Sequence, residues 1–577
     1  MFTAPTREQL FVLKHVTDID ELAGHNRFAD ATPDMVQAIV EGVGDFAEKE
    51  FAPLNRIGDT VGARMQDGHV VMPEGYKAAW RAYVANGWAG IAAPADYGGQ
   101  GLPFSLATVS LESLGAANMA LTLCPILSVG AVEALAHHGS EEQKRTYLPK
   151  LASGEWTGTM NLTEPQAGSD VGALTATATP REDGGWNIRG QKIYITFGDH
   201  DMAENIVHLV LARTPDAPAG TRGISLFLVP KFRVNEDGSI GEDNSVQTVS
   251  IEHKLGINAS PTCVLAYGED GDSIGHLIGP EHAGMRAMFT MMNSARLNVG
   301  LQGVQIGERA TQQALAFAAE RVQSARAGAE TRDAVAIVDH PDVRRMLLRM
   351  KAGTQAIRAL LYYASGQVDR ATLGDEDARA LADLLTPLSK AYATDMGIEI
   401  ASLGIQVHGG MGFVEETGAA QHYRDARIAP IYEGTNGIQA ADLVGRKLAM
   451  DGGAVARGLV DRITGDAGDT GPLADLAAAT GRVLHWMQED AGVDDKLGGS
   501  VPFLTMFATL VCGWLMARQR ATARAEPNDG DDPFLKAKIA AADYYIAAMV
   551  PEATGLEASA RAGAQLLYTL TADEMAA

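Results

Sequence analysis

The spacing of apolar residues changes twice along the 577-residue chain. In residues 33–154 apolar side chains recur three and four positions apart, as Val36, Ile39 and Val40 do, and this period predicts amphipathic helices. In residues 156–267 the period falls to two, and Gly-rich turns separate the alternating runs, which predicts short β-strands. From residue 279 to about residue 450 the helical period returns.

These patterns predict an α+β multidomain protein. We expect an N-terminal helical domain (1–155), a middle β-domain built as a small barrel or sandwich (156–278), a C-terminal helical bundle (279–450) and an additional C-terminal helical extension (451–577). Glycine and aspartate are frequent in residues 451–472, and this composition predicts a linker at the start of the extension.

One apolar run, residues 501–517, contains no charged side chain. As a helix it would rise about 25 Å, which is short of the ~30 Å hydrocarbon core of a bilayer. We therefore expect a buried helix and no membrane span, with membrane contact as the alternative. The N-terminal residues show no apolar signal segment, and the three cysteines are far apart, which predicts a cytoplasmic protein without disulfides or a metal site.

The chain is strongly acidic, with 47 Lys and Arg against 72 Asp and Glu and a formal charge of −25. Such a surface repels phosphate backbones, so we expect no nucleic-acid binding. The extension shares this sign, because residues 451–577 hold ten basic and eighteen acidic side chains.

Two segments of the β-region carry groups suited to a flat ligand. Thr163 lies in a loop rich in Pro, Gly and Ser, whose backbone N–H groups can bind a heteroaromatic ring or a phosphate. Tyr194 and Thr196 are two residues apart on a predicted strand and so share one face, where a ring could cover the ligand and a hydroxyl could bond it. An ordinary turn and an ordinary sheet face are the alternatives.

Glu433 lies between an aromatic residue and a glycine, after an apolar stretch and before a predicted helix. Loss of water at such a place raises the pKa of a carboxyl group toward the range of a general base, whereas a solvated surface glutamate has no such role. Arg296 interrupts an apolar helical pattern. It is expected either to face a ligand as a buried cation or to form an ion pair between helices. His408, next to glycines, is expected to be structural.

Five segments in this order and approximate spacing resemble the acyl-CoA dehydrogenase family: TEPQAGSD, GQKIYIT, RLNVGLQGVQIGERA, QVHGGMGF and YRDARIAPIYEGTNGIQ. The resemblance covers residues 33–447. It implies a C-terminal four-helix bundle, FAD bound between the β-domain and the bundle, and α,β-dehydrogenation of an acyl-CoA thioester. It also implies electron transfer to an electron-transferring flavoprotein and a homodimer or dimer of dimers.

The resemblance assigns roles to individual residues. It implies that Glu433 removes the α-proton while the β-hydride passes to flavin N5, and that the backbone N–H of Glu433 binds the thioester carbonyl. The positions matching FAD contacts are Met160, Leu162, Thr163, Tyr194, Thr196, Arg321, Gln406, Gly410 and Thr435. The positions matching substrate contacts are Ser169, Asn293, Arg296, Tyr432 and Gly434.

The extension is similar to that of the long members of the family. Among these, bacterial enzymes acting on 3-methylmercaptopropionyl-CoA are similar in length and in the segments HVTDIDEL and HPDVRRML, which implies that substrate or another short or medium acyl-CoA. The methionines of residues 285–292 are expected either to line a pocket or to pack in the core. An acyl-CoA oxidase and an alkylation-response-type DNA-associated flavoprotein remain the alternative functions.

Overall fold

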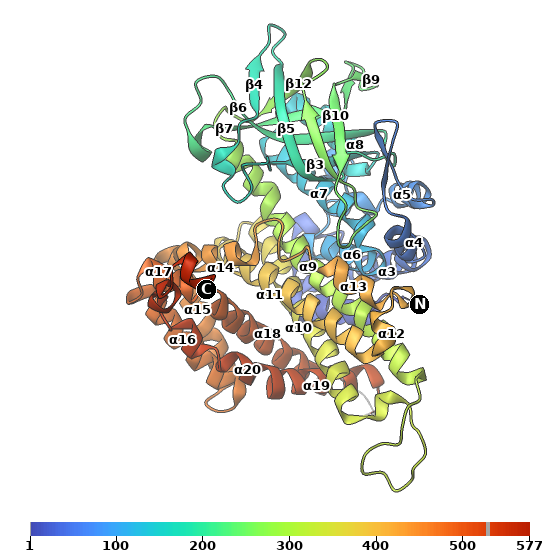
Figure 1. The fold of residues 1–577 in the computed structure, drawn as a ribbon, viewed down its shortest axis with the longest axis vertical. Helices are drawn as coiled ribbons and strands as arrows, with labels where there is room; N and C mark the ends of the chain where they lie inside the picture. Colours follow the sequence, from blue (N-terminus) through green and yellow to red (C-terminus); the bar gives the residue numbers. More distant parts are fainter. Residues whose placement is uncertain (1, 527–530) are drawn as a thin grey trace. The chain divides into compact units, whose positions relative to one another are not determined.

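The computed structural model describes residues 2–526 and 531–577 (Figure 1). The side chain of residue 293 lies outside the described part. The chain forms two compact units. One comprises Asp34–Ala295, and the other comprises Met1–Pro33 together with Arg296–Ala577. The long helix α9 (Gly284–Glu320) runs through the boundary at residue 295.

The unit Asp34–Ala295 begins with helices and continues as a sheet. Its helices are α3 (Pro33–Phe46), α4 (Leu54–Val61), α5 (Tyr76–Ala85), α6 (Phe104–Ala117), α7 (Met119–His138) and α8 (Glu141–Ser153). The start of α8 follows from a capping box, because Ser140 and Gln143 each accept a hydrogen bond from the other's backbone N–H. A short hairpin of β1 (Arg64–Gln66) and β2 (His69–Val71) interrupts the helices.

The β-domain contains an eight-stranded mixed sheet within the described residues. Its order is β10-β11-β5-β12-β7-β6-β3, and β4 pairs with β5 and β6. The strands are β3 (Trp156–Asn161), β4 (Thr177–Pro180), β5 (Trp186–Thr196), β6 (Asn205–Arg213), β7 (Ile224–Pro230), β10 (Val246–Ile251), β11 (Thr262–Tyr267) and β12 (Ser273–Ile278). The small strands β8 (Phe232–Val234) and β9 (Ile240–Asp243) pair with each other.

Helices α7 and α8 pack against strand β3, and apolar side chains from both helices form one core with the sheet (Figure 1). Leu135 and Leu148 from the helices are fully buried, as are Leu209 and Leu226 from the sheet. Met288 and Met291 belong to this core, so these two methionines pack rather than line an open pocket.

Strand β5 contains a bulge at Tyr194. Lys192 pairs with Leu265 and Ile195 with Cys263, so two residues of β5 face one residue of β11. Tyr194 adopts the left-handed region, with φ +59°. The extra residue leaves Tyr194 exposed while Lys192 and Ile195 are both buried. The alternation that the sequence predicts is therefore broken at the bulge, because Lys192 is buried and Tyr194, two residues further on, is exposed.

The second unit is helical. It contains α1 (Thr6–Val12), α2 (Ile19–Ala23), most of α9, α10 (Pro341–Thr372), α11 (Glu376–His408), α12 (Gly410–Phe413), α13 (Ala419–Ala426) and α14 (Asn436–Gly445). On α11, apolar side chains three and four residues apart form a stripe, and Leu384, Leu385 and Leu388 of this stripe are fully buried. The α11 stripe thus forms part of the bundle core, as its spacing predicts.

The extension adds α15 (Ala454–Ala467), α16 (Pro472–Glu489), α17 (Val493–Gly498), α18 (Ser500–Ala525), α19 (Pro533–Tyr544), α20 (Val550–Thr554), α21 (Glu557–Ala560) and α22 (Ala572–Met575). The predicted linker at residues 451–472 is wrong over most of its length, because α15 occupies it. Its buried residues Ala456, Leu459, Val460 and Ile463 have helical spacing that the surrounding Gly and Asp obscured.

Helices α7 and α18 are long and apolar enough to cross a membrane by length and composition. However, 83% and 78% of their most apolar windows are buried inside the structure, which is typical of core helices. The apolar run at residues 501–517 is therefore a buried helix, as predicted.

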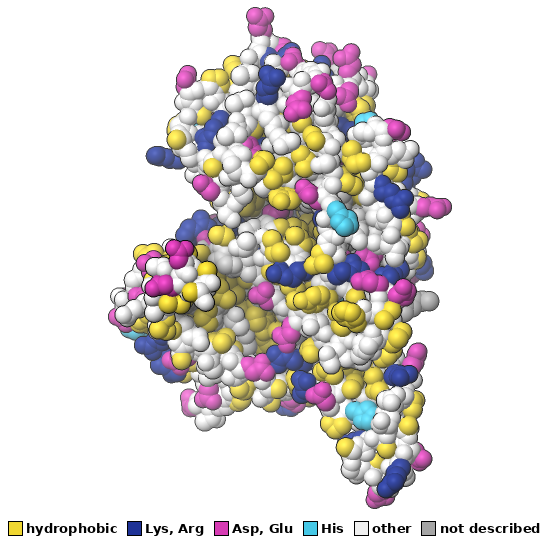
Figure 2. Space-filling view, viewed as in Figure 1, with side chains coloured by type: hydrophobic (Ala, Val, Ile, Leu, Met, Phe, Trp, Pro, Cys, Tyr) yellow, Lys and Arg dark blue, Asp and Glu magenta, His cyan; other side chains and the backbone are white. Residues whose placement is uncertain are grey.

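On the face drawn in Figure 2, acidic and basic side chains are interspersed.

A buried ionic cluster joins the N-terminal helix to the bundle and the extension. The Nζ of Lys538 donates to Glu8 Oε1 over 2.8 Å and to Gln519 Oε1 over 2.5 Å. Arg358 lies 3.7 Å from the same Glu8 oxygen and donates to Glu308 over 2.7 Å. Burial lowers the pKa of Lys538, and Glu8 opposes that change. Lys538, Arg358 and Glu8 are buried, so each of these charges depends on its partners for neutralisation.

Replacing Lys538 by Met should destabilise this unit by about 3–5 kcal/mol, because Glu8 would lose its closest cation in a buried place. Lys536→Met is the matched control on the same helix, since Lys536 forms an exposed pair with Asp531. That control should change stability by less than about 1 kcal/mol. Urea unfolding followed by circular dichroism measures both, and equal effects would contradict the role of the cluster.

Candidate active site

Glu433 sits in a tight turn between α13 and α14. The N–H of Asn436 donates to Pro430 O over 2.9 Å and closes the turn. Thr435 then caps α14, because its hydroxyl accepts a hydrogen bond from the N–H of Ile438 over 3.1 Å. Glu433 itself has φ +54°, a left-handed conformation that is uncommon for residues other than glycine and that clusters at functional sites.

Lys390 and Asn436 hold this turn against α11. The Nζ of Lys390 donates to Gly434 O over 2.8 Å and to Asn436 Oδ1 over 2.9 Å. The Asn436 amide in turn donates to Thr394 Oγ1 and Asp395 Oδ1, over 3.0 Å and 2.8 Å. A side chain at Gly434 would meet Gln439 Nε2 at 2.8 Å, so only glycine fits there without movement. The hydrogen bonds of Lys390 and Asn436, together with the lack of space for a side chain at Gly434, thus fix the backbone position of Glu433.

Burial dominates the electrostatics of Glu433. Loss of water raises the pKa of its carboxyl group to about 7, although Arg296 and Lys390 both act to lower it. Burial also lowers the pKa of Lys390 to about 8, opposed by Glu433 and Asp395. Because the carboxylate has no hydrogen-bond partner among the described residues, it is free to accept a proton from a ligand.

Several polar atoms of α9, the helix that contacts Tyr432, are buried and unpaired in the part of the chain that the structure describes. Tyr432 donates its hydroxyl to Gln302 Oε1 over 2.5 Å, but Gln302 Nε2 has no partner. The same is true of Arg296 Nε and of both amide atoms of Asn298, one turn from Gln302 on α9. Buried polar groups are normally hydrogen-bonded, so this set fits a polar ligand that supplies the missing bonds.

In the β-domain, a buried ion pair orders the loop that carries Thr163. Lys192 donates to Glu164 Oε1 over 2.8 Å and to Leu162 O over 3.0 Å. The carboxylate of Glu164 also accepts from the backbone N–H groups of Thr175 and Ala176. Burial by itself would raise the pKa of Glu164, but Lys192 and these N–H groups lower it to about 2. The pair ties the loop to strand β5.

The residues predicted to contact a flavin are available in this loop and strand. Tyr194 is 61% exposed, and its ring is open to a ligand. The side chains of Met160, Leu162, Thr163 and Thr196 are half-buried. Neither threonine hydroxyl has a hydrogen-bond partner among the described residues. An exposed ring beside unpaired hydroxyls fits a flat heteroaromatic group such as an isoalloxazine.

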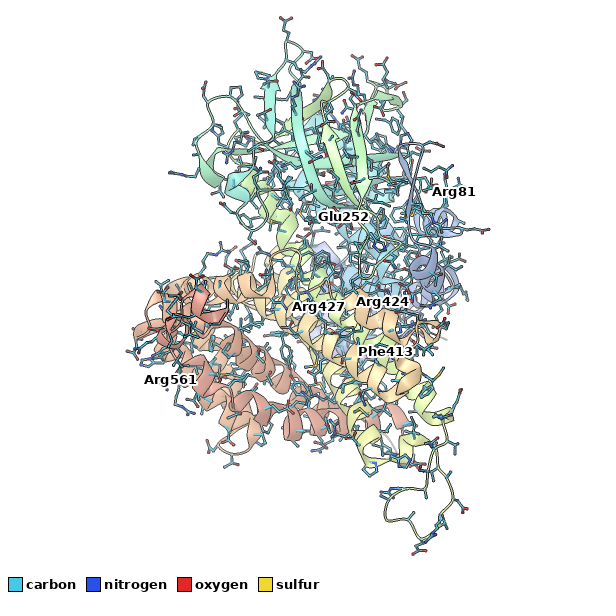
Figure 3. All side chains as sticks on the ribbon, viewed as in Figure 1. Arg81, Glu252, Phe413, Arg424, Arg427 and Arg561 are labelled. Atoms are coloured by element: carbon cyan, nitrogen blue, oxygen red, sulfur yellow. The ribbon has the colours of Figure 1, made fainter. Side chains whose placement is uncertain are left out.

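The other predicted residues lie at surfaces or caps. Arg321, Gln406 and Gly410 are exposed in the helical unit, and Ser169 is exposed in the β-domain. Phe413, close to Gly410 in sequence, is 86% exposed (Figure 3). The side chain of Asn293 lies outside the described residues. The described residues contain no group of three or more His, Cys, Asp and Glu that could hold a metal ion.

His408 is structural, as predicted. Its Nδ1 is 2.7 Å from Gly404 O, and its ring stacks on Phe317 with centroids 4.4 Å apart. The sequence pattern did not point to Lys390 and Asn436, which hold the turn of Glu433, or to Gln302, which binds Tyr432. A lysine within an apolar helical stripe is the one signal that was present for Lys390, since a buried lysine needs a partner.

Family models match successive parts of the chain. They are the acyl-CoA dehydrogenase N-terminal domain (33–155), middle domain (159–268) and C-terminal domain (282–448), followed by the acetyl-CoA dehydrogenase C-terminal-like domain (469–571).

Full-length relatives support the same assignment. The chain is 47% identical over 562 residues to 3-methylmercaptopropionyl-CoA dehydrogenase of Ruegeria pomeroyi, covering 94% of this chain and 95% of that protein. It is 35% identical to a butyryl-CoA dehydrogenase of Syntrophomonas wolfei, covering 96% of both. The fold matches acyl-CoA dehydrogenase from Bacillus anthracis, solved in complex with FAD, with a TM-score of 0.74 and 22% identity over 95% of this chain and 90% of that one. The chain therefore belongs to the acyl-CoA dehydrogenase family, whose members are FAD-dependent enzymes.

Proposed function

We propose that Glu433 is the base of this acyl-CoA dehydrogenase and removes the α-proton of the thioester substrate. The observation that carries the proposal is a half-buried carboxylate whose pKa burial raises to about 7. At neutral pH a base with that pKa is substantially ionised and still binds a proton strongly, which is the best compromise for proton abstraction. Because Arg296 and Lys390 act to lower this pKa, they keep enough of the Glu433 carboxyl group ionised to accept a proton.

The backbone beside the base is suited to stabilising the product of that step. Loss of the α-proton places negative charge on the thioester carbonyl oxygen, as in an enolate. The N–H of Glu433 donates to no group in the described chain. It can therefore donate to that oxygen, and a donor already fixed in a strained turn costs little reorganisation as the charge develops.

FAD is the cofactor, and when bound it supplies the acceptor for the β-hydride. Within the β-domain, Thr163 and Thr196 would bond the ring and Tyr194 would cover it, while Met160 and Leu162 would give backbone contacts. In the helical unit, Thr435 would give a further contact. The exposed Arg321 would bind near the pyrophosphate, and the exposed Gln406 and Gly410 would hold the adenine end. The unpaired hydroxyls and the exposed Tyr194 ring support this assignment.

The 3-methylmercaptopropionyl-CoA dehydrogenase relative supports the corresponding substrate for this chain. The butyryl-CoA dehydrogenase relative supports a short acyl group more generally. We assign substrate contacts to Arg296, Tyr432 and Gly434, together with Ser169 and Asn293. We further propose that an electron-transferring flavoprotein accepts the electrons and so reoxidises the enzyme.

Glu433→Gln should keep bound FAD and lose about 10²–10⁴-fold in turnover, because an amide cannot accept the α-proton. Glu489→Gln, an exposed glutamate of the extension, is the control and should retain wild-type activity. Flavin absorbance reports cofactor content, and substrate-dependent bleaching of that absorbance reports turnover. Bleaching of the Gln variant at the wild-type rate would place the base elsewhere.

The pH dependence of kcat/KM should show an acid limb with an apparent pKa near 7, because only ionised Glu433 accepts the proton. Lys390→Gln keeps hydrogen-bond donors near the turn but removes a cation that lowers the pKa of Glu433. The acid limb of this variant should therefore move to higher pH. Lys536→Gln is the charge-matched control and should leave the limb in place; a downward shift in Lys390→Gln contradicts the assignment.

A panel of CoA thioesters tests the substrate proposal. We expect the highest kcat/KM with 3-methylmercaptopropionyl-CoA or butyryl-CoA and a loss of at least about tenfold with long-chain substrates. Rates are measured with an electron-transferring flavoprotein or an artificial acceptor. A preference for long-chain thioesters would remove the short-acyl assignment while leaving the base assignment intact.

A further inference from the structure

The phenol of Tyr432, the residue before Glu433, has one hydrogen-bond partner among the described residues. Its hydroxyl donates to Gln302 Oε1 on α9 over 2.5 Å. A phenol has a single proton to donate, so this bond occupies the only donor of the Tyr432 side chain. The tyrosine next to the base therefore directs its proton toward α9. It does not donate to the Glu433 carboxylate, which has no hydrogen-bond partner in the part of the chain that the structure describes.

The helix around Gln302 is closely packed against α11. Gln302 is 1% exposed, and Gly300 and Gly303 lie on either side of it in the sequence. At Gly303 a side-chain carbon would lie 1.9 Å from Ala393 O on α11, and at Gly300 it would lie 2.8 Å from Ser389 O. Only glycine allows so close an approach of two backbones. Burial and this backbone contact together limit where Gln302 can place its acceptor oxygen.

The charge of Glu433 acts on the Tyr432 hydroxyl. Burial raises the pKa of Tyr432, the bond to Gln302 opposes that rise, and Glu433 adds to it. The phenol therefore stays neutral and able to donate. Without Gln302 this hydroxyl would lose its only partner, which is costly for a buried group. The carboxylate whose charge already acts on it would then be the available acceptor.

We propose that Gln302 is a positioning residue, which acts through Tyr432 to keep the Glu433 carboxylate free of hydrogen bonds. The inference rests on the proposed role of Glu433 as the base. A carboxylate that accepts a hydrogen bond is a weaker base, because the bond favours its charged form. By binding the phenol proton on α9, Gln302 leaves the carboxylate available for the α-proton of the substrate.

Replacing Gln302 by an apolar residue changes no charge around the base, because the amide is neutral. The charged groups that act on Glu433, or on the cations beside it, are Arg296 on α9, Lys390 and Asp395 on α11, and Asp442 and Arg446 on α14. All of them remain in such a variant. A change in its pH dependence must therefore come from the phenol of Tyr432 or from water admitted to the site.

The pH dependence of kcat/KM tests the proposal. In Gln302→Leu the freed phenol should bond to Glu433 and move the acid limb to lower pH by about one unit or more, as a hydrogen bond to a charged group does. The limit of kcat at high pH should fall by about three- to tenfold, because the base is weaker. Gln302→Met keeps the length of the side chain and should give the same downward shift if Gln302→Leu folds poorly.

Two further variants separate the phenol from other causes. Gln355→Leu removes a buried amide from α10 and should leave the limb in place, since Tyr432 bonds to Gln302 and not to Gln355. Gln302→Leu is then repeated in a Tyr432→Phe background, where no hydroxyl remains to be freed. There it should leave the limb of the Phe variant unchanged.

A downward shift of equal size in both backgrounds would show that entering water causes it, and would overturn the proposal. No shift in Gln302→Leu and Gln302→Met, or an upward one, would overturn it as well. Glu433→Gln distinguishes these failures from a failure of the proposed function. If that variant loses turnover while the limb of Gln302→Leu stays in place, the base assignment stands and only the positioning role is wrong.

Discussion

Two opposing electrostatic effects act on the carboxylate of Glu433, and its proposed role as the base depends on their balance. Removal of water favours the protonated acid, whereas the charges of Arg296 and Lys390 favour the anion. If burial acted alone, the base would be largely protonated at neutral pH. If the cations were in direct contact with it, the anion would be too stable to take a proton from carbon. The structure places both cations close enough to act on the pKa without either of them bonding to the carboxylate.

That balance requires a rigid backbone around Glu433. The rigidity is accompanied by local backbone strain. Glu433 and Tyr194 are both outside the usual backbone region, with φ of +54° and +59°. Such conformations persist only where the surroundings enforce them. For Glu433 the enforcement comes from Lys390, Asn436 and the cap of α14. For Tyr194 it comes from the bulge against β11, which turns the ring outward while the buried Glu164–Lys192 pair holds the neighbouring loop.

Much of the fold could be predicted from the period of the apolar residues. The α11 stripe, the β-domain and the apolar helix α18 follow from it, because long periodic segments leave few alternatives. Helix α15 could not be recognised, since its four buried residues are surrounded by Gly and Asp that are typical of loops. The bulge at Tyr194 was equally hidden, because register is set by the partner strand and not by β5 itself. Glu433 was proposed as the base from its motif, but the cations that lower its pKa come from α9 and α11, far away in sequence.

Hydrogen exchange at the α-carbon tests the central claim most directly, because it reports proton removal without hydride transfer. The FAD-loaded enzyme is incubated in D₂O with an acyl-CoA whose β-carbon carries no hydrogen, and deuterium incorporation is followed by mass spectrometry. The account predicts exchange by the wild-type enzyme that rises with pH to half its maximum near 7, and none above background with Gln at position 433. Exchange at the wild-type rate in that variant would contradict it.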